Sequence, residues 1–373
     1  MDKKIAILAI IVAAIVVVAG IAAILLTRGG EKEDTVYYTT MAPSLMDTWL
    51  AANQSSGYIA WEPFASSAVV AGTGRVLLWS DEIMPNHPCC VVVVSNSFLA
   101  QDFGGGKTGK NLTTNFLRAH MDATLWINDA LAHKDGSNYS KLINMAAAFT
   151  QRSSAVVEEA FKHVRYDYGM NASFRAALAE FTEMYMSYSL VTNETLSGLG
   201  YSSVEDFVSK YADGTYLGAA GSVTETPTIL NPATPIRLGY LGGDLHQVAQ
   251  IVALNETYFE GTSMFEKYGL NVKANTPYLN GNAEMAGFKN GEVDVGYLGA
   301  PPAILKRLNE AIGTTIVAQA NIEGSGLVVS ASSDVESLHD LVGKIVATPG
   351  EASIQHLLLK IALSKEGIAF LKG

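Results

Sequence analysis

Four turns that precede predicted helices carry the residues best suited to chemistry in this sequence. They are Gly242-Gly243-Asp244, Gly281-Asn282-Ala283, Gly299-Ala300-Pro301 and Pro349-Gly350-Glu351. The unpaired backbone N–H groups at a helix N-terminus bind anionic or polar groups of a ligand. A glycine by itself only permits a tight turn. A shared binding site is therefore predicted from the four turns together and from none of them alone.

His246 follows the first of these turns, and the two cysteines of the chain, Cys89 and Cys90, are adjacent. A histidine in a turn is more often a cap or a surface residue, but such turns also line clefts in α/β folds, so contact with a ligand is an equal alternative. The cysteines predict two buried thiols in a strand, with a strained vicinal disulfide as the alternative. No Cys/His spacing matches a zinc site, so neither a metal nor a cofactor is expected.

The run from Gly104 to Asn111 nearly matches a phosphate-binding loop. Asn111 stands where that loop needs a Ser or Thr hydroxyl to hold magnesium, so we interpret the run as a surface loop before a helix at Leu112. No acid/base pair or nucleophile constellation accompanies it, and an enzyme is not expected. The net charge of -11 also disfavours nucleic acid as a partner, because an acidic surface repels phosphate backbones.

Short strands that alternate with helices must position these residues. Strands are predicted at 36–39, 57–61, 89–94, 235–241, 293–298 and 343–347. A helical pattern runs from 112 to 211, and the segment 219–235, rich in Thr, Pro and Ala, predicts an extended linker. The alternation predicts an α/β fold with mainly parallel sheets. Turns at the carboxyl ends of parallel strands share one edge of a sheet and can converge on a cleft.

The N-terminal residues predict a membrane anchor. Ile5 to Leu26 is an uncharged, almost wholly aliphatic run, which as a helix is long enough to cross the hydrocarbon core of a bilayer. The alternative is a cleaved signal peptide, but the run is longer than a usual signal core and lacks a small-residue cleavage site. We expect residues 1–34 to form a single-pass anchor in the cell membrane, with the body of the protein on the extracytoplasmic side.

Several stretches resemble the nitrate/sulfonate/taurine-type (NMT1-like) solute-binding proteins of ABC importers. They are 236–240 with Asp244-Leu245-His246, 291–297, 341–347 with Pro349-Gly350, and 61–64. The resemblance covers nearly everything after residue 34 and implies a two-lobe, type II periplasmic-binding fold that closes on a small polar solute. It also implies an ABC permease of the membrane as the partner. The alternative is a degenerate surface-anchored adhesion or structural protein that has lost solute binding.

The order of the halves differs from that of the family, in which the segment like 236–367 comes first. We interpret this as a circular permutation, with 35–218 as the second half of the binding protein, 219–235 as the linker and 236–373 as the first half. Lobe 1 then combines 236–332 with 88–218, and lobe 2 combines 335–373 with 36–85. The chain is expected to cross near Leu327–Ser330 and Cys89–Val94, and 367–373 to lie beside Val36–Tyr38. Ser56 stands where the family usually has an Asp.

The residues predicted to bind the solute lie in or beside the turns. They are Gly243, Asp244, His246, Asn282, Gly299, Ala300, Glu323, Gly350, Glu351, Ser353, Trp61 and Glu62. The family implies a sulfonate-, taurine-, nitrate- or pyrimidine-like solute. The turns bring carboxylates but no Arg or Lys, and burying a multiply charged anion beside them would be costly. We therefore expect a solute with a hydrogen-bond-donating or cationic group; alternatively, these acids point to solvent as helix caps.

Overall fold

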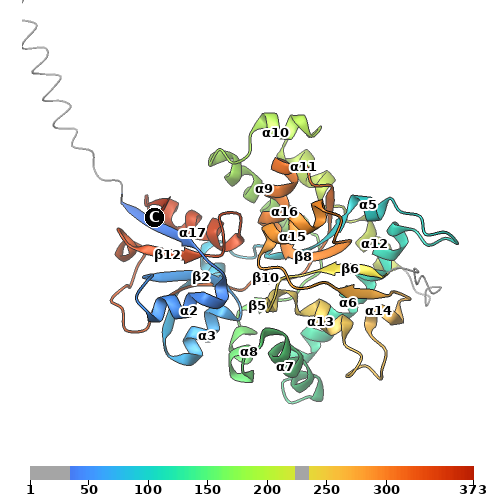
Figure 1. Cartoon of the computed structure of the whole chain (residues 1–373), viewed down its shortest axis with the longest axis horizontal. Coiled ribbons are helices and arrows are strands. Elements are labelled where there is room, and N and C mark those ends of the chain that lie inside the picture. The colour runs from blue at the N-terminus through green and yellow to red at the C-terminus, as the bar shows by residue number, and fades with distance from the viewer. Residues whose placement is uncertain (1–33, 223–234) are drawn as a thin grey trace, which may run out of the picture.

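The computed structural model describes residues 34–222 and 235–373, which form two α/β lobes joined by two crossing segments (Figure 1). Each lobe has its own sheet covered by helices, which is the α/β class that the alternation of strands and helices predicted. The predicted strands at 36–39 and 57–61 appear as β1 (Thr35–Thr40) and β2 (Gly57–Trp61).

One lobe, lobe 2, is built on a six-stranded sheet that uses both ends of the described chain. Its strand order is β13-β1-β12-β2-β11-β3. The remaining bounds are β3 Gly74–Trp79, β11 Ser325–Ser330, β12 Ile345–Thr348 and β13 Ala369–Lys372. The strands β1 and β13 pair in parallel, with Val36 opposite Phe370. The expectation that 367–373 lies beside Val36–Tyr38 is therefore confirmed, and Figure 1 shows blue and red strands together in this lobe.

The other lobe, lobe 1, is built on a five-stranded sheet of order β7-β6-β8-β4-β9. The bounds are β4 Cys90–Ser95, β6 Ile236–Gly239, β7 Val272–Ala274, β8 Val295–Gly299 and β9 Thr314–Gln319. In this sheet β4 runs antiparallel to both of its neighbours, as β11 does in the other sheet. The prediction of mainly parallel sheets is thus confirmed, with one antiparallel strand inside each.

Helices cover both sheets. Their bounds are α2 Pro43–Ala51, α3 Phe64–Ala71, α4 Ser80–Ile83, α5 Asn96–Leu99, α6 Gly109–Ala132, α7 Ser137–Thr150, α8 Ser154–Ala160, α9 Ala172–Ser187, α10 Asn193–Gly198, α11 Val204–Tyr211, α12 Thr215–Ser222, α13 Val248–Leu254, α14 Met264–Lys267, α15 Gly281–Lys289, α16 Ala300–Glu310 and α17 Ile354–Lys365, with 3-10 turns η1 Leu245–Gln247 and η2 His339–Leu341. The helical pattern predicted for 112–211 corresponds to α6–α11. The run from Gly104 to Gly106 is an exposed loop before α6, as predicted.

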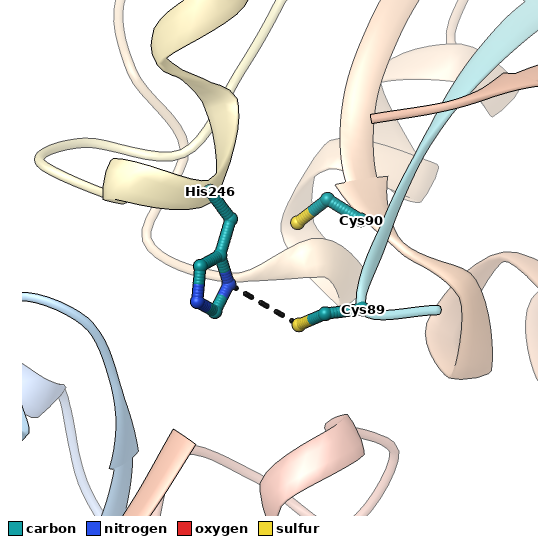
Figure 2. A group of neighbouring side chains, drawn as sticks. All are labelled: Cys89, Cys90 and His246. Atoms are coloured by element: carbon teal, nitrogen blue, oxygen red, sulfur yellow. Dashed lines mark hydrogen bonds between the residues drawn. The ribbon is translucent and has the colours of Figure 1, made fainter. Parts of the chain in front are cut away.

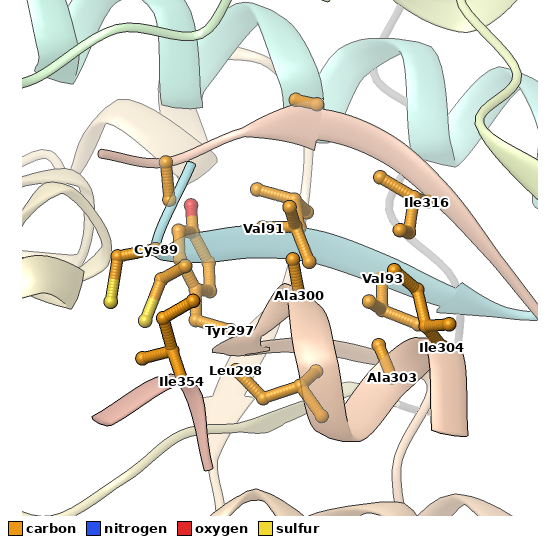
Figure 3. Close-up of a cluster of buried hydrophobic side chains, with 14 of the residues drawn as sticks. Cys89, Val91, Val93, Tyr297, Leu298, Ala300, Ala303, Ile304, Ile316 and Ile354 are labelled. Atoms are coloured by element: carbon orange, nitrogen blue, oxygen red, sulfur yellow. The ribbon is translucent and has the colours of Figure 1, made fainter. Parts of the chain in front are cut away.

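The core is continuous around β4 (Figure 3). The valines Val91–Val94 are fully buried, as expected for a strand with neighbours on both edges and helices against its faces. On the side shown in Figure 3, Ala300, Ala303 and Ile304 of α16 pack against β4. Ile354 of α17 joins the same cluster, so apolar contact extends from one lobe to the other.

The chain crosses between the lobes at 80–89 and at 320–324, in the stretches before β4 and β11. The predicted border of lobe 1 lies after 332, with a crossing strand near Leu327–Ser330. This border is wrong, because β11 hydrogen-bonds to β2 and β3 and so belongs to the six-stranded sheet. The crossing stretch itself carries β10 (Ile322–Glu323), which pairs with β5 (Val164–Arg165) of lobe 1.

The predicted linker begins later than expected. Residues 219–222 belong to α12, which packs against α6, because Ala219 and Ala220 favour a helix. Residues 223–234 and the predicted anchor within 1–33 lie outside the described residues. Among the helices of 34–222 and 235–373, none combines the length and apolarity needed to cross a membrane.

Candidate functional site

The turns at the carboxyl ends of five parallel strands meet between the lobes. The turns after β6, β7 and β8 come from lobe 1, and the turns after β2 and β12 come from lobe 2. Between them lies a cavity of about 30 Å³. Its lining residues are Trp61, Cys89, Cys90, Leu241, Asp244, His246, Asn280, Gly281, Asn282, Gly299, Pro302, Pro349, Gly350, Ala352, Ser353, Ile354 and Gln355. We call this the interlobe cavity.

Three helix N-termini point their first turns at this cavity. Asn280 caps α15 by accepting a hydrogen bond from the Ala283 N–H (3.0 Å), and Ser353 caps α17 by accepting one from the His356 N–H (3.2 Å). Gly299 precedes α16, which has prolines in its first turn. A proline is tolerated there because the first N–H groups of a helix have no partner inside it. Local capping chemistry thus brings these turns to the cavity.

Seven of the predicted site residues line the interlobe cavity. They are Trp61, Asp244, His246, Asn282, Gly299, Gly350 and Ser353. The lining does not include Gly243, Ala300, Glu62, Glu323 and Glu351. Gly243 and Ala300 are the chain neighbours of Asp244 and Gly299. Glu62 and Glu323 are held by their own partners, and Glu351 lines a groove outside the cavity.

Each of these glutamates has a local partner. Glu323 forms an ion pair with Arg165 (2.8 Å) and accepts a hydrogen bond from the Asn86 N–H. Glu351 is exposed and accepts a hydrogen bond from the Tyr38 hydroxyl (3.0 Å). Glu62 is fully buried and accepts hydrogen bonds from the Ser66 N–H and hydroxyl. Burial raises the pKa of Glu62 to about 7, although the hydrogen bonds from Ser66 lower it.

The floor of the cavity is a buried polar cluster that joins the start of β4 to η1 (Figure 2). The thiol Sγ of Cys89 lies 3.2 Å from Nδ1 of His246. Asp244 caps η1 by accepting a hydrogen bond from the His246 N–H (3.0 Å), and its other oxygen accepts one from Gln247 Nε2 (3.1 Å). The same oxygen lies 3.6 Å from Cys90 Sγ. Both thiols are free and only 2% exposed, so the prediction of buried thiols is confirmed.

The charges in this cluster depend on one another. Burial opposes ionisation of Cys89, but its hydrogen bond with Cys90 and the charge of His246 outweigh burial and lower its pKa to about 5. Burial likewise favours neutral His246, but the charges of Cys89 and Asp244 prevail and raise its pKa to about 9. Burial raises the pKa of Asp244 to about 6. The floor therefore favours a thiolate–imidazolium pair beside a carboxylate at neutral pH.

Two polar atoms beside the cavity have no hydrogen-bond partner among the described residues. They are the indole Nε1 of Trp61, a donor, and Oδ1 of Asn282, an acceptor. Buried polar groups are nearly always paired, so an unpaired donor and an unpaired acceptor at one cavity indicate groups that a ligand satisfies. Lysine and arginine do not occur among the described residues of the lining.

The lobes are in contact around the cavity. The Leu245 N–H donates to the Glu62 carbonyl across the cleft (3.0 Å). The rings of Trp79 and His163 stack with centroids 3.6 Å apart. Above the cavity, Asn280, Asn282 and Gly350 also line an outer groove of about 390 Å³ that includes Met41 and Leu279. The cavity is thus the closed end of a larger cleft.

Sequence reasoning did not include Cys89, Cys90, Asn280 or Gln355 in the site, although all four line the cavity. Gln355 donates a hydrogen bond to Ser325 Oγ (2.9 Å), so it contacts the crossing region from α17. The available signal was the position of the cysteines at the expected crossing strand. A residue at that point lies where the two lobes meet.

Two family models match the chain. Residues 15–140 match the model described as NMT1-like family, and residues 251–372 match the model described as NMT1/THI5 like. The two matches do not overlap, and together they cover about two thirds of the chain. Searches among curated proteins and among solved structures gave no match.

Proposed function

The chain belongs to the NMT1-like family of solute-binding proteins, whose members are generally not enzymes, and from this premise we propose that it captures a small polar solute between its lobes. The observation that carries the proposal is the convergence of turns from both lobes on one cavity that has an unpaired donor and an unpaired acceptor. Closure around such a cavity couples the binding of a solute to the position of the lobes.

The lining limits the chemistry of the solute. A matching solute accepts a hydrogen bond from Trp61 Nε1, donates one to Asn282 Oδ1, and tolerates the Asp244 carboxylate beside it. A multiply charged anion would be buried near Asp244 without a cationic side chain, which is costly. A zwitterion such as an aminosulfonate, or a polar heterocycle, satisfies these conditions. Because the cavity holds only about 30 Å³, a solute larger than a few atoms enters only when the lobes open.

The proposed cellular role is delivery to an ABC permease from an anchored position on the extracytoplasmic side of the cell membrane. The apolar run from Ile5 to Leu26 supports the anchor, and the family supports the role in import. We also propose that the fold is circularly permuted. The parallel pairing of β1 with β13 supports this, because it brings the two ends of the described chain to adjacent strands, as rejoined halves require.

Calorimetric titration of the full chain in detergent tests the proposal. Aminosulfonates, amines and neutral heterocycles are compared with sulfate and phosphate, and at least one of the first group is expected to bind. Trp61→Phe keeps the ring and removes the donor, so it is expected to weaken that binding by about 3- to 10-fold. Trp49→Phe, on the partly exposed α2 outside the cavity, is the matched control and keeps full affinity.

Tight binding of sulfate or phosphate without binding of any amine or heterocycle contradicts the proposed solute class. Absence of binding by the whole panel favours the alternative, a surface protein that has lost solute binding.

A further inference from the structure

We propose that Cys89, Cys90 and His246 form a site for one thiophilic d¹⁰ cation, Zn²⁺ or Cu⁺, at the floor of the interlobe cavity. Two thiol sulfurs and one imidazole nitrogen are donors that such ions prefer. The three ligand atoms lie within 4.8 Å of one another, and all three residues are buried (Figure 2). The inference concerns this cluster alone and does not depend on the proposed solute.

The spacing of the donor atoms fits one ion. In a tetrahedral zinc site the metal–sulfur and metal–nitrogen distances are about 2.3 and 2.0 Å, which places neighbouring ligand atoms about 3.3–3.8 Å apart. Cys89 Sγ and His246 Nδ1 are already 3.2 Å apart. The ligand atoms all lie within 4.8 Å of one another, so the largest separation has to shorten by only about 1 Å to reach these distances.

The imidazole is held in the orientation that a metal ligand needs. His246 Nε2 lies 2.7 Å from the Gly324 carbonyl oxygen, which can only accept, so Nε2 carries the hydrogen. Nδ1 is therefore the nitrogen that faces Cys89 Sγ, and a metal ion that displaces the proton on Nδ1 would be bound by this atom. A backbone carbonyl that orients a histidine from its other nitrogen is the usual outer partner of a metal-ligating imidazole.

The thiols are held from a different element. The Cys90 N–H donates to Asn321 Oδ1 (2.8 Å), which fixes the start of β4 beside the crossing stretch at 320–324. Asp244 is close enough to complete the coordination, because its oxygens lie 3.4 Å from His246 Nδ1 and 3.6 Å from Cys90 Sγ. When both thiols lose their protons to a bound cation, the cation also compensates the negative charge that they and the Asp244 carboxylate then place in a buried position, which is otherwise costly.

Titration of the full, metal-free chain with Co²⁺ under a non-chelating reductant tests the proposal. One cobalt ion per chain is expected, with thiolate-to-cobalt charge-transfer absorption that Zn²⁺ abolishes by displacement. A second arm adds Cu⁺ against a competing chelator and distinguishes the two ions. Cys89→Ser, Cys90→Ser and His246→Gln are each expected to weaken Zn²⁺ binding by at least about 100-fold, since loss of a mere outer partner costs about 10- to 100-fold. His339→Gln, an exposed histidine far from the cluster in sequence, is the control.

A second measurement needs no variant and so does not depend on whether the variants fold. Bound Zn²⁺ is expected to protect Cys89 and Cys90 of the wild-type chain from alkylation, as read by mass spectrometry of the peptides. Absence of the charge-transfer absorption in the reduced chain, absorption that persists in Cys89→Ser, or equal alkylation with and without Zn²⁺ would each overturn the proposal.

Discussion

Replacing Gly324 by alanine is expected to destabilise the chain more than the same replacement at any glycine of similar backbone conformation in open space. Gly324 has φ +89°, in the left-handed region. An added Cβ would lie 2.7 Å from Cγ2 of Val164 and still closer to Nε2 of His246. The Gly324 carbonyl also accepts hydrogen bonds from the Glu62 N–H and from His246, so any backbone shift disturbs both lobes.

The magnitude follows from two contributions. The left-handed conformation costs an alanine roughly 1–2 kcal/mol, and overpacking in a well-filled region typically adds about 1–3 kcal/mol. Gly324→Ala is therefore expected to lower the free energy of unfolding by about 2–5 kcal/mol. Gly343→Ala is the matched control, because Gly343 has φ +76° and a Cβ there would meet no atom within 4 Å. It should lose only the roughly 1–2 kcal/mol of the backbone contribution.

Urea unfolding of both variants and of the wild type measures these differences, provided that the denaturant slopes agree. If Gly324→Ala and Gly343→Ala lose the same free energy within about 0.5 kcal/mol, the close approach of β5 and η1 to the crossing stretch at 320–324 is wrong, and with it the orientation of His246.

Three further predictions concern charge, closure and the anchor. Burial raises the pKa of Glu62 from 4.5 to about 7, so between these pH values the folded chain keeps a proton that the unfolded chain has lost. The free energy of unfolding therefore falls as pH rises from 4.5 to about 7. Glu62→Gln should make this fall smaller in unfolding experiments at a series of pH values. If stability depends on pH in Glu62→Gln as it does in the wild type, the raised pKa of Glu62 is contradicted. Trp79→Ala removes the stack on His163 between the lobes and should increase the radius of gyration in small-angle scattering, whereas Trp49→Ala should not. The mature protein should begin at or next to Met1 in N-terminal sequencing; a start near Gly29–Glu33 would indicate a cleaved signal instead.

The alternation of strands and helices could be predicted from the sequence because each unit is local. The strand β2 has the predicted bounds, and the turns after β6, β7, β8 and β12 do meet at one cavity. Their convergence follows from a general property of parallel sheets, whose carboxyl ends share an edge. For this reason Asp244, Asn282 and Gly350 were placed correctly beside the cavity without knowledge of any distance.

The cluster at the cavity floor, the orientation of the glutamates and the border between the lobes depend on contacts between residues far apart in the chain. Cys89 and His246 are separated by 157 positions, so no local spacing could reveal their contact. The expectation that the chain has no metal ligands was based on local spacing alone. Glu323 and Glu351 are predicted site residues because of their turns, but Glu323 pairs with Arg165, and Glu351 accepts a hydrogen bond from Tyr38 and lines only the outer groove. The predicted border of lobe 1 at 332 was wrong. The apolar sequence of β11 indicates a strand buried on both faces, but it does not reveal which of the two sheets the strand joins.

The pairing of β1 with β13 has a consequence for the order in which the molecule is made. The five-stranded sheet has all its strands once synthesis passes Gln319, whereas the six-stranded sheet needs the chain as far as Lys372. Until then β1 has a free edge where β13 will pair, and an unpaired edge strand invites pairing with other chains. Domains generally fold as they emerge, so the lobe that contains the first strand is expected to be completed last. Newly made chains are therefore most vulnerable to proteases and to aggregation in lobe 2.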